Sequence, residues 1–165
     1  MHDPIFVREV RPDDLPEILG INVESSPGVS RLTVPGIAGL TTEATLAWVA
    51  VADRAIAGYL IAFLGSASYG GEEFAWFKER MQNFVYVDQV ALARSYRGRG
   101  IGSMLYSQLE RWGSRQLCRS LNCEVNLDPP NPVSMAFHTS YGFIEIGRMH
   151  TSDGRHVALL QKEVR

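Results

Sequence analysis

The sequence has few cysteines, little excess of charge of either sign and no long apolar run. Among its 165 residues are 2 Cys, and 16 Lys and Arg stand against 18 Asp and Glu, a formal net charge of −2. This balance argues against a wholly basic nucleic-acid-binding protein, so we expect no nucleic-acid partner. No stretch of about 20 apolar residues is present, so we expect no membrane span. Cys118 and Cys123 do not form a CxxC pair and suggest no disulfide framework.

The first residues carry acid and proline where a signal peptide has a basic end and an apolar run. Together with the scarce cysteines, this predicts a reduced, cytoplasmic setting. The 15 Gly and 8 Pro are scattered without a period, which excludes a collagen-like chain. We expect a single domain over residues 1–165, because two domains of that total length would each be small.

Apolar periodicity predicts the order of strands and helices. Strands are expected at residues 5–10, 46–52, 55–64, 84–92, 121–127, 142–149 and 156–162. Helices are expected from Asp13, over 100–117 and over 132–140, with a loop or short helix within 25–42 and a helical centre in the 65–83 insert. This order predicts an α/β (α+β) fold with one mixed sheet and helices packed on it.

The most informative stretch, residues 97–102, reads RGRGIG and lies between a predicted strand and a predicted helix. Glycines let the backbone approach a ligand closely and adopt unusual torsion angles. The first turn of a helix presents unpaired N–H groups at the positive end of the helix dipole, and two arginines add charge. The stretch therefore predicts an anion site, most naturally for a pyrophosphate. The alternative is a glycine-rich turn that only starts a helix.

Two common nucleotide motifs do not fit this stretch. The P-loop pattern GxxxxGK[ST] is missing from the sequence. The dinucleotide pattern GxGxxG fails because Ser103 stands where the third glycine belongs. A dinucleotide-binding oxidoreductase is therefore a remote alternative.

Residues 97–102 resemble the acyl-CoA signature Q/R-x-x-G-x-G/A of the GCN5-related N-acetyltransferases (GNAT). Residues 131–134 (NPVS) and 137–143 (FHTSYGF) are similar to a second pattern of this family. The order of predicted elements also resembles the family fold over essentially the whole chain. The resemblance implies one GNAT-like domain with a mixed, mostly antiparallel sheet of about seven strands, splayed between strands four and five.

The resemblance also implies acetyl-CoA as the cofactor. The strand backbone at Val90 and Leu92 would pair with the pantetheine arm, amides from Arg97 to Ser103 would hold the pyrophosphate, and Asn131 would contact the arm or the adenine side. The implied cofactor-binding residues are Val90, Ala91, Leu92, Arg97, Gly98, Arg99, Gly100, Ile101, Gly102, Ser103, Asn131 and Ser134.

Acetylation of an amine requires a base, because an amine with a pKa near 10 is mostly ammonium at neutral pH. Asp88, the only carboxylate in residues 84–92, is the predicted base, although Tyr86 lies nearer the position of the glutamate in histone-acetylating members. Many family members carry a tyrosine that protonates the leaving thiolate where this sequence has His138; His138 or Tyr141 is predicted for that role. The structural alternative for Asp88 is a strand-edge carboxylate that is hydrogen-bonded to a backbone group or paired with an arginine. The alternative for His138 is a half-buried helix residue that is hydrogen-bonded to a neighbour.

Three further groups of residues leave alternatives open. Glu124 and Asn126 alternate on the 121–127 strand and either line the same cleft or face solvent. The aromatic residues of the 65–83 insert form a wall for substrate, a satellite core or a dimer contact; they are Tyr69, Phe74, Trp76 and Phe77. The histidines have no metal-ligand spacing, so no metal site is expected; they are His2, His138, His150 and His156.

The sequence thus predicts an acetyl-CoA-dependent N-acetyltransferase that transfers the acetyl group directly to an amine of a small molecule or a protein N-terminus. The acceptor amine is of unknown identity, and a homodimer is a further expectation because members of the family often dimerise. The alternative is a non-catalytic acyl-CoA-binding sensor module of the same fold, since the usual tyrosine is replaced by His138.

Overall fold

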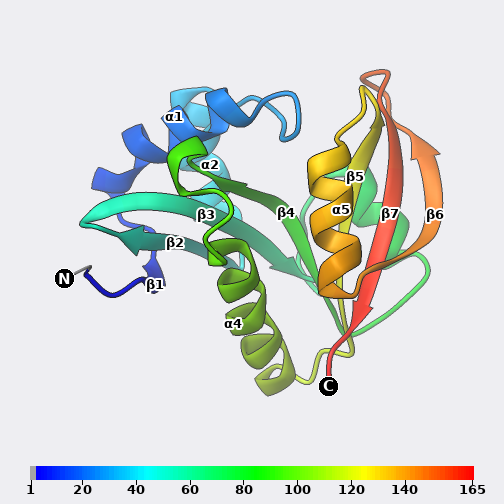
Figure 1. Cartoon of the computed structure of the whole chain (residues 1–165). Helices are drawn as coiled ribbons and strands as arrows, with labels where there is room; N and C mark the ends of the chain where they lie inside the picture. The colour runs from blue at the N-terminus through cyan, green and yellow to red at the C-terminus, as the bar shows by residue number, and fades with distance from the viewer. Residues whose placement is uncertain (1–2) are drawn as a thin grey trace. The chain divides into compact units, whose positions relative to one another are not determined.

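The computed structural model describes residues 3–165, which fall into two compact units (Figure 1). The first unit consists of the chain up to Phe63 together with Asp88–Gln108, and the second of Leu64–Val87 together with Leu109–Arg165. Strand β4 (Phe84–Leu92) and helix α4 (Ile101–Arg115) contribute to both units. Because the chain enters each unit twice, neither is a continuous segment; the assignment of residues 1–165 to one domain stays a prediction.

The first unit combines an antiparallel strand arrangement with two helices. Its elements are β1 (Phe6–Glu9), α1 (Leu15–Ser25), α2 (Val34–Glu43), β2 (Leu46–Ala52) and β3 (Ala55–Leu64), with 3-10 turns at Pro12–Asp14 and Arg94–Tyr96. β2 pairs antiparallel with both β1 and β3. Helix α2 occupies the stretch in which the sequence allowed a loop or a short helix, and the Thr33 side chain caps it by accepting a hydrogen bond from the Gly36 N–H.

The second unit places a hairpin beside β5. Its elements are α3 (Glu72–Lys78), β5 (Ser120–Asp128), α5 (Pro132–Tyr141), β6 (Ile144–His150) and β7 (His156–Glu163). β7 lies between β5 and β6 and pairs antiparallel with both, so β6 forms the outer edge (Figure 1). Gly142 ends α5 with a left-handed backbone (φ 116°), a conformation that glycine adopts without steric cost.

The strand order is β1-β2-β3-β4-β5-β7-β6. The β4–β5 pair is parallel, which confirms a mixed, mostly antiparallel seven-stranded sheet flanked by helices. The described pairing of β4 with β5 runs from Phe84↔Ser120 to Tyr86↔Asn122, whereas β4 continues to Leu92. The described parallel ladder therefore ends well before β4 does.

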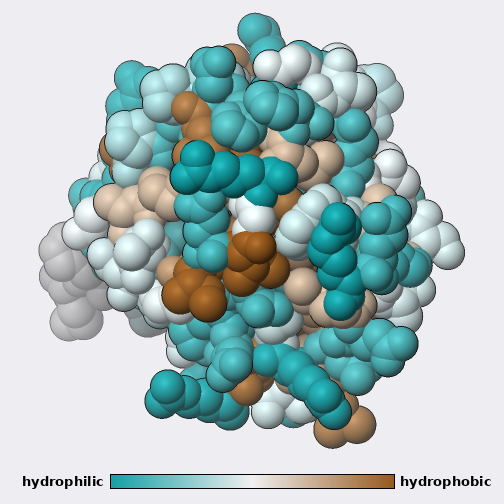
Figure 2. All heavy atoms as spheres, turned by 90° about the vertical axis from the view of Figure 1, so that its right-hand side faces the viewer, coloured by the Kyte–Doolittle hydropathy of each residue, from teal (hydrophilic) through white to brown (hydrophobic). Residues whose placement is uncertain are grey.

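The cores follow the apolar patterns of the strands. β3 is almost wholly buried, which suits a central strand with a near-continuous apolar run. In the second unit, the aromatic rings of Phe74, Phe77, Phe84 and Tyr86 pack together with centroids 5.6–6.2 Å apart. The face that contains β6 is mainly hydrophilic, with apolar atoms in small areas (Figure 2). Among residues 3–165, no helix is long and apolar enough to cross a bilayer.

Candidate functional site

The predicted anion-binding turn adopts the backbone that its glycines permit. Gly98 and Gly100 have φ values of +76° and +79°, and nothing lies within 4 Å of a Cβ built at either residue. Helix α4 begins directly afterwards at Ile101, so the N–H groups of its first turn lack intrahelical partners. Ile101 itself is buried and anchors the turn to the core, while residues 97–100 are exposed. An exposed turn of this kind, at the positive end of a helix, suits a pyrophosphate.

The two arginines of the turn are held by neighbours within the first unit. The Arg97 guanidinium donates to the Leu92 carbonyl (3.2 Å) and to the Ser25 hydroxyl (3.3 Å). Arg99 lies over the Tyr96 ring, 5.1 Å from its centroid, and 3.9 Å from the Asp53 carboxylate. Both side chains remain exposed, so their charges are available to an anion at the turn.

Strand β4 precedes this turn in the chain. It carries the predicted pantetheine contacts and the predicted base. Burial alternates along its second half: Gln89 and Ala91 are buried, whereas Asp88, Val90 and Leu92 are half-buried. The last three therefore share one face, as side-chain alternation predicts. The end of β4 is fixed by a hydrogen bond from the Ala93 N–H to the Ala57 carbonyl (2.8 Å).

A buried polar cluster behind β4 was not predicted from the sequence. The Asn22 Nδ2 lies within hydrogen-bonding distance of the Ser30 carbonyl (2.9 Å), the Tyr59 hydroxyl (3.2 Å) and Gln89 Oε1 (3.1 Å). Tyr59 donates to the same Gln89 oxygen (2.7 Å), and the Leu32 N–H donates to Asn22 Oδ1 (2.8 Å). Polar residues on the apolar face of α1 and inside an apolar strand were the signal for this cluster.

The cluster brings the predicted base close to a buried phenol. Burial raises the pKa of Tyr59, the hydrogen bond from Asn22 opposes this, and the negative charge of Asp88 raises the pKa further. Tyr59 therefore stays protonated at neutral pH. Asp88 is half-buried, and its role as the base stays a prediction.

His138 is buried in the second unit, with 3% of its surface exposed. Its Nδ1 lies 2.8 Å from the Ser134 carbonyl, which can only accept, so Nδ1 carries the proton of the neutral ring. The ring makes edge contacts with Phe137 and Phe143, each at 5.2 Å between centroids. Burial lowers the pKa of His138 and the Ser134 hydrogen bond partly offsets this, so the ring is neutral at pH 7. This geometry is that of the hydrogen-bonded helix residue; the catalytic role stays a prediction.

Tyr141, the second predicted acid, has a hydrogen-bond partner as well. Its hydroxyl donates to Glu110 Oε2 at 2.6 Å, and Glu110 also pairs with Lys162 at 2.5 Å. Burial and the Glu110 carboxylate together raise the pKa of Tyr141. The phenol therefore carries its proton at neutral pH, but that proton is directed at Glu110.

Asn131 and Ser134 form the start of α5. The Asn131 side chain is the N-cap and accepts a hydrogen bond from the Ser134 N–H at 3.2 Å. Pro132 is the first residue of α5, where the missing N–H removes no hydrogen bond of the helix. The capping contact gives both residues a structural role, and their contact with a cofactor stays a prediction.

The 65–83 insert joins the core of the second unit. Phe74 and Phe77 are buried, and Tyr69 packs on Phe74 with centroids 5.7 Å apart. Trp76 lies against Gly147, where a Cβ would come within 2.6 Å of the indole ring. The aromatic residues thus build the satellite core that was one of the alternatives.

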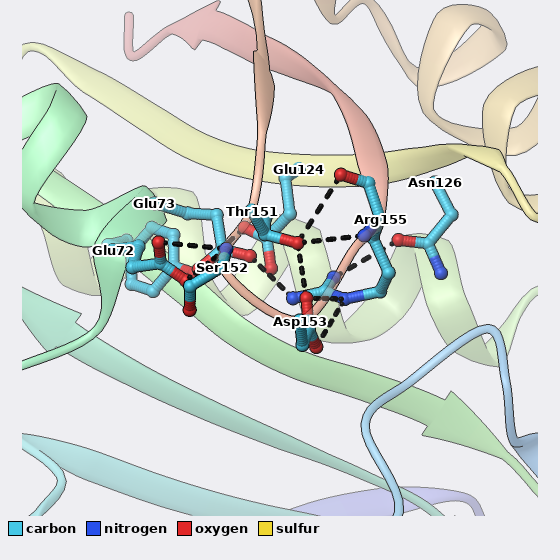
Figure 3. A network of polar contacts seen from close by, with 9 residues as sticks. Glu72, Glu73, Glu124, Asn126, Thr151, Ser152, Asp153 and Arg155 are labelled. Carbon is cyan, nitrogen blue, oxygen red and sulfur yellow. Dashed lines mark hydrogen bonds and ion pairs between the residues drawn. The ribbon is translucent and has the colours of Figure 1, made fainter.

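A polar network surrounds the turn between β6 and β7 (Figure 3). Arg155 contacts Glu73 at 2.8 Å, Asp153 at 3.0 Å and the Asn126 side-chain oxygen at 3.1 Å. Glu124 lies two residues before Asn126 on β5 and accepts a hydrogen bond from the Tyr86 hydroxyl at 2.8 Å. The sequence singled out Glu124 and Asn126 but gave no indication that Asn126 contacts Arg155 or that Arg155 pairs with Glu73.

The structure therefore gathers the predicted residues into two groups, one in each unit. Asp88, Val90–Leu92 and 97–103 belong to the first unit, and the α5 residues to the second. Within residues 3–165, no group of three or more His, Cys, Asp or Glu side chains is arranged to hold a metal ion. His2 lies outside the described residues.

Comparison with known proteins gives consistent results. A model of the acetyltransferase (GNAT) family matches residues 24–143. Ard1 from Thermoplasma volcanium has a TM-score of 0.79 at 19% identity, covering 98% of each chain. The ribosomal-protein-S18-alanine N-acetyltransferase from Escherichia coli has a TM-score of 0.74 at 16% identity, covering 98% of this chain and 94% of the other. YncA from Salmonella typhimurium, solved with acetyl-CoA, has a TM-score of 0.73 at 14% identity, covering 99% and 95%. At these identities the structures show a shared fold.

A curated relative matches a shorter stretch. Aminoglycoside N(6')-acetyltransferase type 1 of Salmonella typhimurium is 29% identical over 65 residues. These make up 39% of this chain and 43% of the relative, so the match spans less than half of the relative's length.

Proposed function

The chain belongs to the acetyltransferase (GNAT) family, and from this premise we propose that it is an acetyl-CoA-dependent N-acetyltransferase. The observation that carries the proposal is the turn at residues 97–103, of which residues 97–100 are exposed. Two glycines with positive φ, two exposed arginines and the start of α4 create an anion site there. These residues fit the pyrophosphate of acetyl-CoA, and β4 offers Val90–Leu92 to its pantetheine arm.

For the acceptor, we propose an amine of a small molecule or a protein N-terminus. The curated relative is named for acetylation of an aminoglycoside, and one structural neighbour for acetylation of ribosomal-protein-S18 alanine. Both names describe acetyl transfer to an amine nitrogen. We therefore choose kanamycin and a hexapeptide with a free N-terminal alanine as probes.

The reaction needs one proton removed and one supplied. Acetyl-CoA supplies a thioester whose carbonyl carbon the amine nitrogen attacks. Asp88, on the same face of β4 as Val90 and Leu92, takes the proton from the amine, directly or through a water. His138 or Tyr141 gives a proton to the thiolate sulfur. At neutral pH both groups hold a proton that is already donated: the Tyr141 hydroxyl donates to Glu110, and the Nδ1–H of neutral His138 donates to the Ser134 carbonyl.

The alternative function is an acyl-CoA-binding module without turnover. The observation that favours it is that His138 and Tyr141 both make hydrogen bonds inside the second unit, to Ser134 and Glu110. Such contacts would have to open before either residue protonates a thiolate.

A thiol-release assay with acetyl-CoA and the two probes tests the proposal. We expect Asp88→Asn to lower kcat by about 100-fold with unchanged acetyl-CoA affinity, because the base is lost. Gly100→Ala should weaken acetyl-CoA binding about tenfold, since a side chain at φ +79° is strained.

Gly154→Ala is the matched control for acetyl-CoA affinity, because Gly154 has φ +87° and open space around its Cβ position. Acetyl-CoA binding without release of thiol would favour the binding module. A wild-type protein that does not bind acetyl-CoA would overturn the proposal.

A further inference from the structure

Two histidines lie opposite each other where β6 ends and β7 begins. His150 is the last residue of β6 and His156 the first of β7, and the antiparallel register pairs them directly. Directly opposite residues of such a pair point to the same face of the sheet. Their imidazole rings are stacked, with centroids 4.2 Å apart and planes inclined by 9°. The hairpin thus brings together two histidines whose spacing in the sequence matches no metal motif.

The turn between the strands keeps this pair close. The Thr151 N–H donates to the Arg155 carbonyl at 2.9 Å. Because hydrogen-bonded and non-hydrogen-bonded pairs alternate along an antiparallel ladder, His150 and His156 form a non-hydrogen-bonded pair, where side chains approach most closely. Among the described residues 3–165, neither imidazole has a hydrogen-bond partner, and neither residue is fully buried. Their ring nitrogens are therefore open to a ligand.

A carboxylate lies beside the pair. Asp128, the last residue of β5, is the register partner of His156 on the other side of β7, and it is exposed. The three strands run side by side in the order β5, β7, β6 (Figure 1), so one acid and two histidines form a row across them. Arg148 lies two residues before His150 and is already paired with the Glu145 carboxylate. The charge around the pair therefore suits a cation.

The distance between the rings is close to what a metal ion needs. Neutral imidazole is a common ligand of zinc. Two nitrogens bound at about 2.0–2.1 Å to a tetrahedral zinc ion lie about 3.4 Å apart, close to the 4.2 Å between these centroids. The ion binds in the plane of each ring, so both stacked rings must rotate about Cβ–Cγ, a broad torsion in histidine. Since neither residue belongs to the buried core, the core does not have to repack.

We propose that His150 and His156 form a two-histidine site for Zn²⁺ or another divalent transition-metal ion that prefers nitrogen ligands, with Asp128 as a neighbouring negative charge. The two nitrogens occupy half of a tetrahedral coordination shell, and water occupies the rest. The bound ion joins β6 to β7 and stabilises the hairpin. None of these three residues is assigned to acetyl-CoA or to proton transfer, so the inference does not depend on the proposed function.

Calorimetric titration of the full, untagged chain with ZnCl₂ tests the site. We expect one Zn²⁺ per chain. His150→Gln and His156→Gln should each weaken binding by at least about tenfold, because a single nitrogen loses the advantage of two linked ligands. Asp128→Asn should weaken binding about threefold, the size of an exposed ion-pair contribution. MgCl₂ should show no binding, since Mg²⁺ prefers oxygen ligands.

The other two histidines of the chain supply matched controls. His2→Gln and His138→Gln remove an imidazole outside the pair, so both variants should bind Zn²⁺ with wild-type affinity. The thiols of Cys118 and Cys123 are buried and should not compete for the ion. Loss of Zn²⁺ binding in His2→Gln or His138→Gln, with unchanged binding in His150→Gln and His156→Gln, would move the site elsewhere and overturn the proposal.

Hydrogen exchange of residues 149–157 gives a second readout. Bound Zn²⁺ should slow this exchange in the wild type and leave it unchanged in His150→Gln and His156→Gln, because an ion that binds the folded hairpin stabilises it. A wild type that does not bind Zn²⁺ overturns the site, and unchanged exchange at saturating Zn²⁺ overturns the stabilising role. Equal affinity in Asp128→Asn overturns the role of that carboxylate. Absence of acetyl transfer contradicts the proposed function alone.

Discussion

Each unit holds a cluster of hydrogen-bonded polar side chains, and the two clusters are built from different chemistry. In the first unit, Asn22, Tyr59 and Gln89 are neutral, and their exposed fractions are 0%, 0% and 4%. In the second unit, the cluster around Arg155 contains the Glu73 and Asp153 carboxylates, and the Arg155 side chain remains 22% exposed.

The difference shows how each unit meets the cost of removing polar groups from water. Neutral amides and hydroxyls can be buried completely when every group finds a hydrogen-bond partner. Charged groups carry a much larger desolvation penalty, so they retain contact with solvent. The first cluster therefore fixes the backbone at Ser30 and Leu32 at any moderate pH and ionic strength, whereas the second depends on charge.

The largest effect is expected from Asn22→Leu in the neutral cluster. The change removes the acceptor of the Leu32 N–H, one of two donors to the Ser30 carbonyl, and the amide that contacts the buried Tyr59 and Gln89, so the free energy of unfolding should fall by about 3 kcal/mol. Urea unfolding at pH 7 measures this loss. Gln116→Leu, at an exposed position, should change stability by less than about 0.5 kcal/mol. A loss below about 1 kcal/mol for Asn22→Leu would mean that the cluster does not stabilise the unit.

Arg155→Met should cost less, about 2 kcal/mol in low salt, because its partly exposed ion pairs are weakened by solvent. The difference in the free energy of unfolding between the wild type and Arg155→Met should shrink in about 1 M NaCl, since salt screens these charges. The loss in the free energy of unfolding caused by Asn22→Leu should not change with salt. Urea titrations at the two salt concentrations test this contrast, and equal salt sensitivity of the two variants would contradict it. Arg148→Met is the exposed control.

The smallest effect concerns pH. Burial lowers the pKa of His138 in the folded protein, whereas an unfolded histidine has a pKa near 6.5. Below that value the unfolded chain binds more protons than the folded one, so stability falls as pH decreases from about 6.5 toward the folded pKa. We expect the free energy of unfolding of the wild type to fall between pH 7 and 5, and the profile of His138→Gln to be flatter.

The neutral cluster supplies the control for this pH profile. Asn22→Leu removes no titrating group, so its profile should run parallel to that of the wild type. A His138→Gln profile with the wild-type slope would show that another group is responsible for the pH dependence in this range.

Much of the fold follows from patterns that act over a few residues. The expected strands at 46–52, 55–64 and 84–92 match β2, β3 and β4, because each is a continuous apolar run bounded by turn residues. The Asp53-Arg54 turn joins β2 and β3 with positive φ at both residues. Helix α2 was harder to predict, because Pro35 and two glycines resemble a break. Pro35 in fact lies in the first helical turn, where proline is tolerated.

The candidate site also has one part that could be predicted from the sequence and one part that could not. The turn at residues 97–102 could be predicted from its own letters, because positive φ at Gly98 and Gly100 and the start of a helix are local properties. The surroundings of His138 could not, since its contact with the Phe143 ring and the burial that lowers its pKa exist only in the folded unit.

The sequence by itself determined the strands, the helix starts and the glycine turn at residues 97–102, because these depend on neighbours in the chain. Only the tertiary structure decided which polar residues become partners. Asn22 meets Gln89 across 67 positions, and Glu73 meets Arg155 across 82. No local pattern encodes such pairs, because their energy appears only when folding removes both groups from water and leaves each as the other's hydrogen-bond partner.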